Sequence, residues 1–203
     1  MRRKLKRIGI CLLLVCAVWC ASVVKDRQSL HQELIRLHII ANSDSDEDQQ
    51  LKLRVRDAVL ESLREDMKSI TDPQKAGQYL SENLPKLKAA AEKVLHQAGA
   101  DQSVAVCLGE EEYPVREYDT FRLPSGVYQS LRIVLGSGSG HNWWCVVFPE
   151  LCAPATVAGF EETAQCADFS DTLTAALEGR EGYSIRFFLL DLLGKAETFL
   201  RRS

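Results

Sequence analysis

The segment Gly136-Ser137-Gly138-Ser139-Gly140 is the first place to test for chemistry, because glycine-rich loops hold nucleophiles and phosphates in many enzymes. A nucleophile elbow has serine at the centre of Gly-x-Ser-x-Gly and a helix after it. This loop has glycine at its centre and is followed by an apolar, strand-like run. A phosphate-binding loop also requires a helix directly after the glycines. We therefore expect a plain turn at 136–140, and neither a serine hydrolase nor a nucleotide site.

Three acidic residues, Asp44, Asp46 and Asp48, resemble the first ligands of a calcium-binding loop. The glycine that should follow them is Gln49, and the glutamate that should stand at the twelfth position is Val55. Carboxylates and serines at this spacing also suit the positive N-terminal end of a helix. Helix capping therefore explains the three residues better than calcium binding does.

The four histidines show no paired ligand spacing, and the sequence has no Cys-x-x-Cys motif. A zinc site would have to be assembled wholly by the fold. Carboxylates are plentiful, but no pair stands out for acid–base catalysis. We expect no catalytic residues, no metal, no cofactor and no small-molecule substrate.

An aromatic cluster on two predicted strands is the remaining candidate site. It contains Tyr128, Trp143, Trp144 and Phe148. Strand alternation places the two tryptophans on opposite faces of the sheet, so we expect one of them to be exposed and to contact a partner protein. In the alternative interpretation, helices cover both faces and both indoles belong to the core.

Several periodic segments must position these residues. Residues 34–40 alternate as in a half-buried strand and lead into an amphipathic helix after the 43–48 loop. Pro73 and Pro85 mark the starts of two further helices, or of one kinked helix, that end before Gly99. Period-two runs at 104–108, 113–118, 127–135 and 141–148 predict strands, the last two forming a hairpin across the glycine loop.

The C-terminal part has a short predicted helix at 170–177 and a long amphipathic helix at the end. The apolar stripe of that last helix is expected to lie against a sheet or another helix. It consists of Ile185, Phe188, Leu189, Leu192, Leu193, Ala196, Phe199 and Leu200. The sequence therefore predicts an α+β fold, in which an antiparallel sheet carries amphipathic helices and follows an N-terminal signal or anchor helix.

The first seven residues carry five positive charges, and 17 uncharged residues follow from Ile8 to Val24. This pattern is typical of an export signal. The run is near the short limit of about 20 residues for a membrane span, so a cleaved signal peptide and an uncleaved anchor both remain open for residues 1–24. We expect residues 25–203 to form one exported domain, because the basic flank stays in the cytoplasm.

The charge and the cysteines fit that location. The whole chain has a formal charge of −3; without the five N-terminal cations, 20 Lys and Arg face 28 Asp and Glu, which gives −8. An acidic domain is a poor nucleic-acid binder.

Cys107, Cys145, Cys152 and Cys166 can pair in three ways in an oxidising space. Cys145 and Cys152 are close enough to be joined if the chain folds back at Pro149, and free core thiols are the alternative.

Three stretches together resemble the stage II sporulation protein R family of endospore-forming bacteria. They are the Ile35–Asp46 run with the helix from Asp48 to Val59, the Leu123–Gly136 run, and the Gly140–Cys152 run. With the export signal they cover most of residues 1–152.

The resemblance implies a signal that is made in the forespore and exported into the intermembrane space of the sporulation septum. It would be either secreted or anchored by its N-terminal segment to the outer face of the cytoplasmic membrane. There it would activate a membrane-embedded aspartic protease of the mother cell, which cleaves the precursor of the early mother-cell sigma factor. No catalytic residues carry over, so Asn42, Asp44, Tyr128, Trp143 and Trp144 are the positions expected to contact the partner. An exported hydrolase or cell-wall-modifying enzyme, or a passive component of the septal space, are the alternatives.

Overall fold

A four-stranded sheet forms the centre of the computed structural model, which describes residues 2–118, 120–149, 160, 164–165 and 167–202. The strands are β1 (Ile35–Ile40), β2 (Val104–Tyr113), β5 (Gly126–Leu135) and β6 (Asn142–Phe148), in the spatial order β2-β5-β1-β6. The short strands β3 (Arg116–Glu117) and β4 (Arg122–Leu123) pair separately. The α+β class predicted from the sequence is confirmed.

The sheet is mixed, whereas the sequence predicted an antiparallel one. Strand β1 runs parallel to β5 and antiparallel to β6, and β2 is antiparallel to β5. The predicted hairpin between β5 and β6 is wrong, because β1 lies between them. The physical reason is that β1 is buried on both faces: Leu37 and the polar Arg36 are both fully buried. A strand with two buried faces takes a central place in a sheet.

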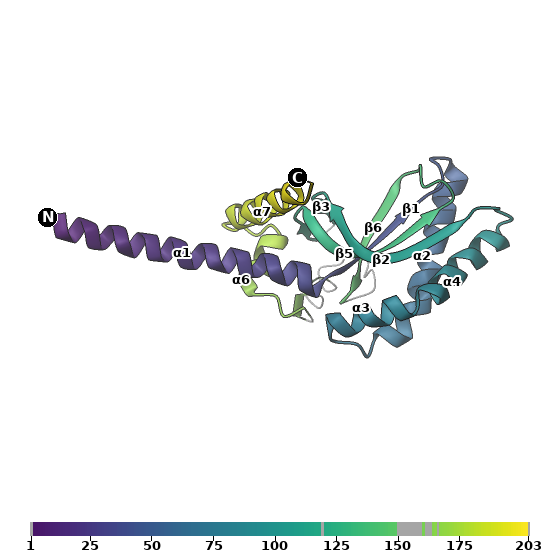
Figure 1. Ribbon diagram of the computed structural model, residues 1–203, viewed down its shortest axis with the longest axis horizontal. Helices are drawn as coiled ribbons and strands as arrows, with labels where there is room; N and C mark the ends of the chain where they lie inside the picture. The colour runs from purple at the N-terminus through teal and green to yellow at the C-terminus, as the bar shows by residue number, and fades with distance from the viewer. Residues whose placement is uncertain (1, 119, 150–159, 161–163, 166, 203) are drawn as a thin grey trace.

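Helices cover both faces of this sheet (Figure 1). One face carries α2 (Asp46–Met67), α3 (Pro73–Glu82) and α4 (Leu84–Gln97), whose apolar residues join the cluster around Leu37 and Ile133. The other face carries α6 (Asp171–Leu177), α7 (Ser184–Arg202) and the end of α1 (Arg2–Glu33), which join the cluster around Tyr128. The domain thus has one core on each side of the sheet.

The predicted helix starts are confirmed by capping contacts. Ser45 caps α2, since its Oγ accepts a hydrogen bond of 3.2 Å from the backbone N–H of Asp48. Asp72 caps α3 through its Oδ1, and Pro85 lies in the first turn of α4. These are the local interactions that a sequence pattern specifies best.

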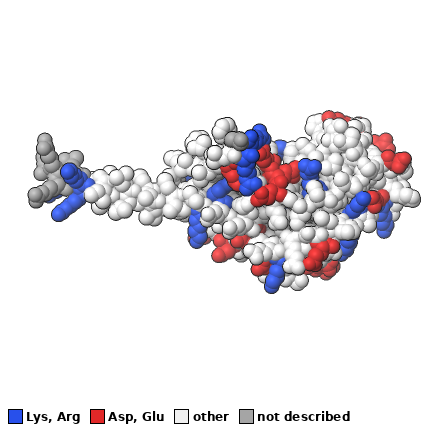
Figure 2. All heavy atoms as spheres, viewed as in Figure 1, with Lys and Arg blue, Asp and Glu red and all other residues white. Residues whose placement is uncertain are grey.

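Helix α1 continues from the basic N-terminus without a break to the first strand and projects away from the domain (Figure 1). Its uncharged part separates the basic start from the charged body of the protein (Figure 2). It is the one helix among the described residues that is long and apolar enough to cross a membrane, and few of those apolar residues are buried. Only its last turns, including Val23 and Leu30, pack on the domain.

The expected orientation of the C-terminal helix is wrong. Most of its predicted apolar stripe points outward, and Ile185, Phe188 and Phe199 are 65%, 61% and 72% exposed. The face that packs on the domain instead contains Arg186 and Asp191, with Phe187, Leu190 and Gly194. The ion pair of Arg186 with Asp26 and the hydrogen bonds of Asp191 with Ser125 fix this face inward, which turns the apolar stripe outward.

Gly140 is required by a close backbone approach between two loops. A Cβ at this position would lie 2.2 Å from the carbonyl oxygen of Ser43, whereas a Cβ at Gly109 would meet nothing within 4 Å. We predict that Gly140→Ala lowers the free energy of unfolding by about 1–3 kcal/mol. The exposed strand position Gly109→Ala should leave it unchanged or slightly raised. Urea unfolding of both variants tests this, and equal stability of the two would contradict the close approach.

Candidate functional site

Two loops from the sequence motifs pack against each other at one end of the sheet, and we call residues 41–48 and 136–142 the loop corner. The backbone N–H of Gly140 donates to the carbonyl of Ala41 (2.9 Å), and that of Ser137 donates to Asn42 Oδ1 (3.0 Å). The ends of the parallel strands β1 and β5 bring these loops together. Asn42 therefore holds the corner together from within.

Asp48 is the polar centre of the loop corner. Its carboxylate accepts hydrogen bonds from Asn42 Nδ2 (2.9 Å), Ser43 Oγ (2.5 Å) and Gln102 Nε2 (2.6 Å). The hydrogen bond from Ser43, followed by that from Asn42, lowers the pKa of Asp48 below its ordinary value, although burial opposes the shift. Protein donors therefore occupy both carboxylate oxygens of Asp48.

The exposed side of the corner presents a carboxylate beside a histidine. Asp44 Oδ1 accepts a hydrogen bond from the backbone N–H of His141 (2.6 Å) and lies 2.5 Å from its Nδ1. Both side chains are more than half exposed. Beneath them the carbonyl of His141 accepts a hydrogen bond from Lys52 Nζ (2.8 Å), and burial lowers the pKa of that lysine. Asp44 is thus the predicted contact residue that the loops leave at the surface.

The two tryptophans of β6 lie on opposite sides of the sheet and each packs against one of the two cores. Both are half-buried, whereas the sequence led us to expect one exposed indole. The ring of Trp144 stacks on His38 and has the Arg116 guanidinium 3.4 Å from its centre. The ring of Trp143 has Arg56 of α2 at 4.6 Å, and its Nε1 is buried with no partner among the described residues. Each indole is therefore capped by an arginine.

Tyr128 lies wholly inside the protein. Its hydroxyl donates to the carbonyl of Pro124 (2.7 Å) and accepts from Arg27 Nη1 (3.3 Å), and burial raises its pKa. Tyr128 is one of the five predicted contact residues, but its side chain is fully buried and cannot contact a partner protein. Trp143, Asp44 and Asn42 lie toward the loop corner, while Trp144 packs on the opposite face.

Arg36 is a charged residue buried inside the protein, among aromatic side chains. It is fully buried, its guanidinium lies 4.0 Å from the ring of Tyr113, and its Nη2 donates to the hydroxyl of Tyr118 (2.6 Å). Its Nε and Nη1 have no hydrogen-bond partner among the described residues. The alternation of residues 34–40 predicted a half-buried strand, and nothing in the sequence indicated that aromatic rings would enclose Arg36.

A histidine, a carboxylate and a serine do meet inside the sheet, but not in the order of a catalytic triad. His38 Nδ1 lies 2.8 Å from Glu111 Oε1, and Ser130 Oγ donates to Glu111 Oε2 (2.8 Å). A triad requires the histidine to contact the hydroxyl. Here the carboxylate of Glu111 lies between the histidine and the hydroxyl, and Ser130 is buried. Burial acts to raise the pKa of Glu111, but the hydrogen bonds from His38 and Ser130 outweigh it, so the pKa is lowered.

The structure describes only one of the two cysteines of the predicted disulfide. Cys145 is disulfide-bonded, while Cys107 and the three cysteines of α1 are free thiols. Cys152, the predicted partner, lies outside the described residues, as does Cys166. The pairing of Cys145 with Cys152 stays a prediction.

These motifs match a known protein family. A model described as Stage II sporulation protein R matches residues 31–157. The chain belongs to this family. It is 43% identical over 120 residues to Stage II sporulation protein R of Bacillus subtilis (strain 168), an alignment that covers 59% of this chain and 54% of that protein. The match thus spans about half the length of this curated relative, and no solved structure matches.

The family match extends across the whole sheet and the loop corner. It begins at His31, near the end of α1, and ends before α6 and α7. The three motifs that carried the resemblance form the adjacent strands β5, β1 and β6 and the loops at one end of them. Parts of all three motifs therefore meet in the loop corner.

The hydrogen bonds to Asp48 predict a pH-dependent contribution to stability. Because the folded pKa is lowered, the ionised carboxylate stabilises the fold above the unfolded pKa of about 3.9, and this contribution is lost as the pH falls through the lower folded value. Asp48→Asn should lower the free energy of unfolding by about 1–3 kcal/mol at neutral pH. The gap to wild type should narrow below about pH 3.9.

Urea unfolding between neutral pH and pH 3, followed by tryptophan fluorescence, measures this gap. Asp101→Asn is the matched control, because Asp101 is exposed and its side chain makes no hydrogen bond or ion pair with the described residues. A gap that stayed constant over the whole pH range would show that the charge of Asp48 contributes nothing.

Proposed function

We propose that this chain is an exported sporulation signal, which is made in the forespore and activates a membrane-embedded aspartic protease of the mother cell. That protease then processes the precursor of the early mother-cell sigma factor. Membership of the stage II sporulation protein R family carries the proposal. The exposed apolar helix with its basic start supports export or anchoring at the membrane.

The rival proposal, an exported hydrolase or wall-modifying enzyme, would be favoured by a pocket that holds His38, His141 and a carboxylate together. His38 is buried between Glu111 and Asn142, whereas His141 is exposed beside Asp44. The two histidines therefore belong to separate contacts. This arrangement favours a protein that acts through binding.

The contact with the protease is best placed at the edge of the sheet around Trp143. Trp143 and Arg56 stack there, and Asp44 and His141 lie exposed at the adjoining loop corner. Tryptophan and arginine carry much of the binding energy in protein interfaces. Trp144 is a weaker candidate because His38 and Arg116 already contact its ring.

The place of this surface in the fold suits the proposal. Strand β1 begins directly after α1, and the loop corner follows the other end of that strand. Six strand residues extend about 20 Å, so the corner lies at the end of the domain away from the membrane helix (Figure 1). A domain held at one septal membrane would thereby present Trp143 toward the space that separates it from the other.

We predict that Trp143→Ala reduces processing of the sigma precursor by about tenfold or more when the chain and the protease are produced together. An activator must bind the active state of the protease more tightly than the inactive one, so losing a central contact lowers activation. Processing is measured by immunoblot of the precursor and product.

Asp46→Ala is the matched control, since Asp46 is exposed on the same loop corner and its side chain forms no hydrogen bond or ion pair within the described part of the chain. Trp143→Phe keeps an aromatic ring beside Arg56 and should retain more activity than alanine if folding is preserved. Full processing by a folded Trp143→Ala protein, together with its loss in folded His38→Ala or His141→Ala protein, would favour the enzyme.

Export itself makes a separate prediction. A reporter that is active only outside the cytoplasm, fused after Ser203, should be active because the basic flank keeps the N-terminus inside. Replacing the five cations before Ile8 with neutral residues should reduce that activity. Activity of a cytoplasmic reporter alone would remove the basis of the signalling proposal.

A further inference from the structure

Helix α7 exposes a stripe of large apolar side chains on its outward face. Its large exposed members are Ile185, Phe188, Leu192, Leu193, Phe199 and Leu200. Four of these, at 185, 188, 192 and 199, follow the spacing of a single helix face. A stripe of this length on the surface of a monomer marks a place that another apolar phase contacts.

Three contacts on the opposite face prevent the helix from turning this stripe inward. Arg186 forms a buried ion pair with Asp26 of α1 (2.5 Å), and Asp191 Oδ1 accepts hydrogen bonds from the backbone N–H and hydroxyl of Ser125 (3.0 and 2.5 Å). Gly194 packs so closely that an added Cβ would lie 1.7 Å from the carbonyl oxygen of Ser125. The outward orientation of the stripe is therefore fixed by the fold.

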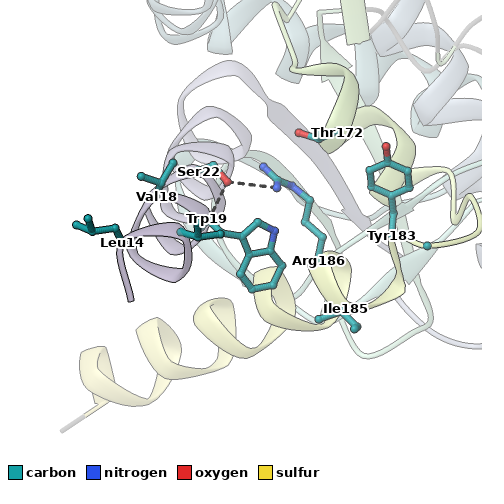
Figure 3. Close-up of a pocket in the computed structure, with 10 residues that line it drawn as sticks. Leu14, Val18, Trp19, Ser22, Thr172, Tyr183, Ile185 and Arg186 are labelled. Carbon is teal, nitrogen blue, oxygen red and sulfur yellow. Dashed lines mark hydrogen bonds between the residues drawn. The ribbon is translucent and has the colours of Figure 1, made fainter. Parts of the chain in front are cut away.

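The first turn of α7 lies beside the apolar run of α1. Together they line an open, mostly apolar groove of about 740 Å³ (Figure 3). Ile185 and Tyr183 stand on one side of it, and Val18 and Trp19 on the other. Ile185 is the first residue of the stripe, so the stripe begins at the level of the membrane-length helix.

The length of the apolar run determines how deep that level is. The 17 uncharged residues from Ile8 to Val24 extend about 25 Å as a helix, which is slightly less than the hydrocarbon thickness of about 30 Å. A bilayer of that thickness around α1 would therefore reach Val24 on the side of the helix that the domain does not cover. Val18 and Trp19 then lie within the leaflet on the exported side, and Ile185 lies beside them.

Helix α7 also crosses the foot of α1 obliquely. Arg186 contacts Ser22 (3.3 Å) near the start of α7, and Glu197 contacts Arg27 (2.8 Å) near its end. The contact thus moves about 16 Å along α7 while it moves only about 7 Å along α1. A helix at this angle leans over the membrane surface that surrounds α1.

We propose that the outward stripe of α7 lies in the interface of the exported-side leaflet, as an amphipathic helix that holds the domain against the bilayer beside α1. The inference rests on the proposed membrane location of α1. Trp19 and Tyr183 supply the aromatic groups that favour this depth. Arg201 and Arg202 are bound to Glu110 and Glu112, so apolar contact and not lipid charge drives the association.

The test uses the full chain in vesicles of phosphatidylethanolamine and phosphatidylglycerol, with photo-reactive benzoylphenylalanine at single positions. Phe188→benzoylphenylalanine and Leu192→benzoylphenylalanine should form lipid adducts on irradiation, read by mass spectrometry. The control is Glu61→benzoylphenylalanine on α2, which is exposed on the far side of the sheet. We expect adduct yields at least about tenfold above that control. Melting curves should match wild type, because these side chains point outward.

Leu14→benzoylphenylalanine in α1 separates failure of this proposal from failure of the proposed membrane location. Lipid adducts at 14 but not at 188 and 192 would overturn the role of α7 and leave the membrane segment intact. Adducts to a second copy of the chain at 188 and 192 would overturn it in favour of a dimer. Absence of lipid adducts at all three positions would overturn both.

Discussion

The burial of β1 on both faces is the constraint on which the rest of the structure depends. Leu37 and Ile39 enter one core, while Arg36 enters the other and lies against Tyr113 with Tyr118 as its hydrogen-bond acceptor. A buried guanidinium is costly unless its surroundings compensate, and aromatic rings provide part of that compensation. Because β1 needs cover on both faces and a neighbour on each edge, the chain must leave β5, pass the end of β1 and return as β6. The loop corner is the direct product of that crossing.

The sequence predicted well wherever a local interaction decides the structure, and less well where a distant one does. Ser45, Asp72 and Pro85 begin helices through contacts within a few residues, and these starts are confirmed. The hairpin between β5 and β6 was wrong because the glycine loop and the two flanking strands look the same whether or not a third strand lies between them. Only the double-sided burial of β1 separates the two cases, and its alternating Arg36 and His38 made that strand look half-exposed.

The sequence supplied candidate contact residues but not the side chains that surround them. Asn42, Asp44 and Trp143 lie toward one end of the sheet, and their contact with a partner stays a prediction. The sequence could not identify Arg56 and Arg116 as the residues stacked on the tryptophans, because neither lies near them in the chain. Nor could it show that Tyr128 is enclosed, since a tyrosine suits an interface and a core equally well.

Helix α7 shows why amphipathicity alone does not tell which face of a helix is buried. An apolar stripe stabilises the protein only when its surface is removed from water, and contact with a bilayer removes it from water as well as burial in a core does. The ion pair between Arg186 and Asp26, in contrast, is specific: removing one partner from such a buried pair costs about 3–5 kcal/mol, which exceeds the gain from burying one more leucine. The polar face therefore decides the orientation. Because Asp26 belongs to α1, the same ion pair that turns the stripe outward also attaches α7 to the foot of the long apolar helix.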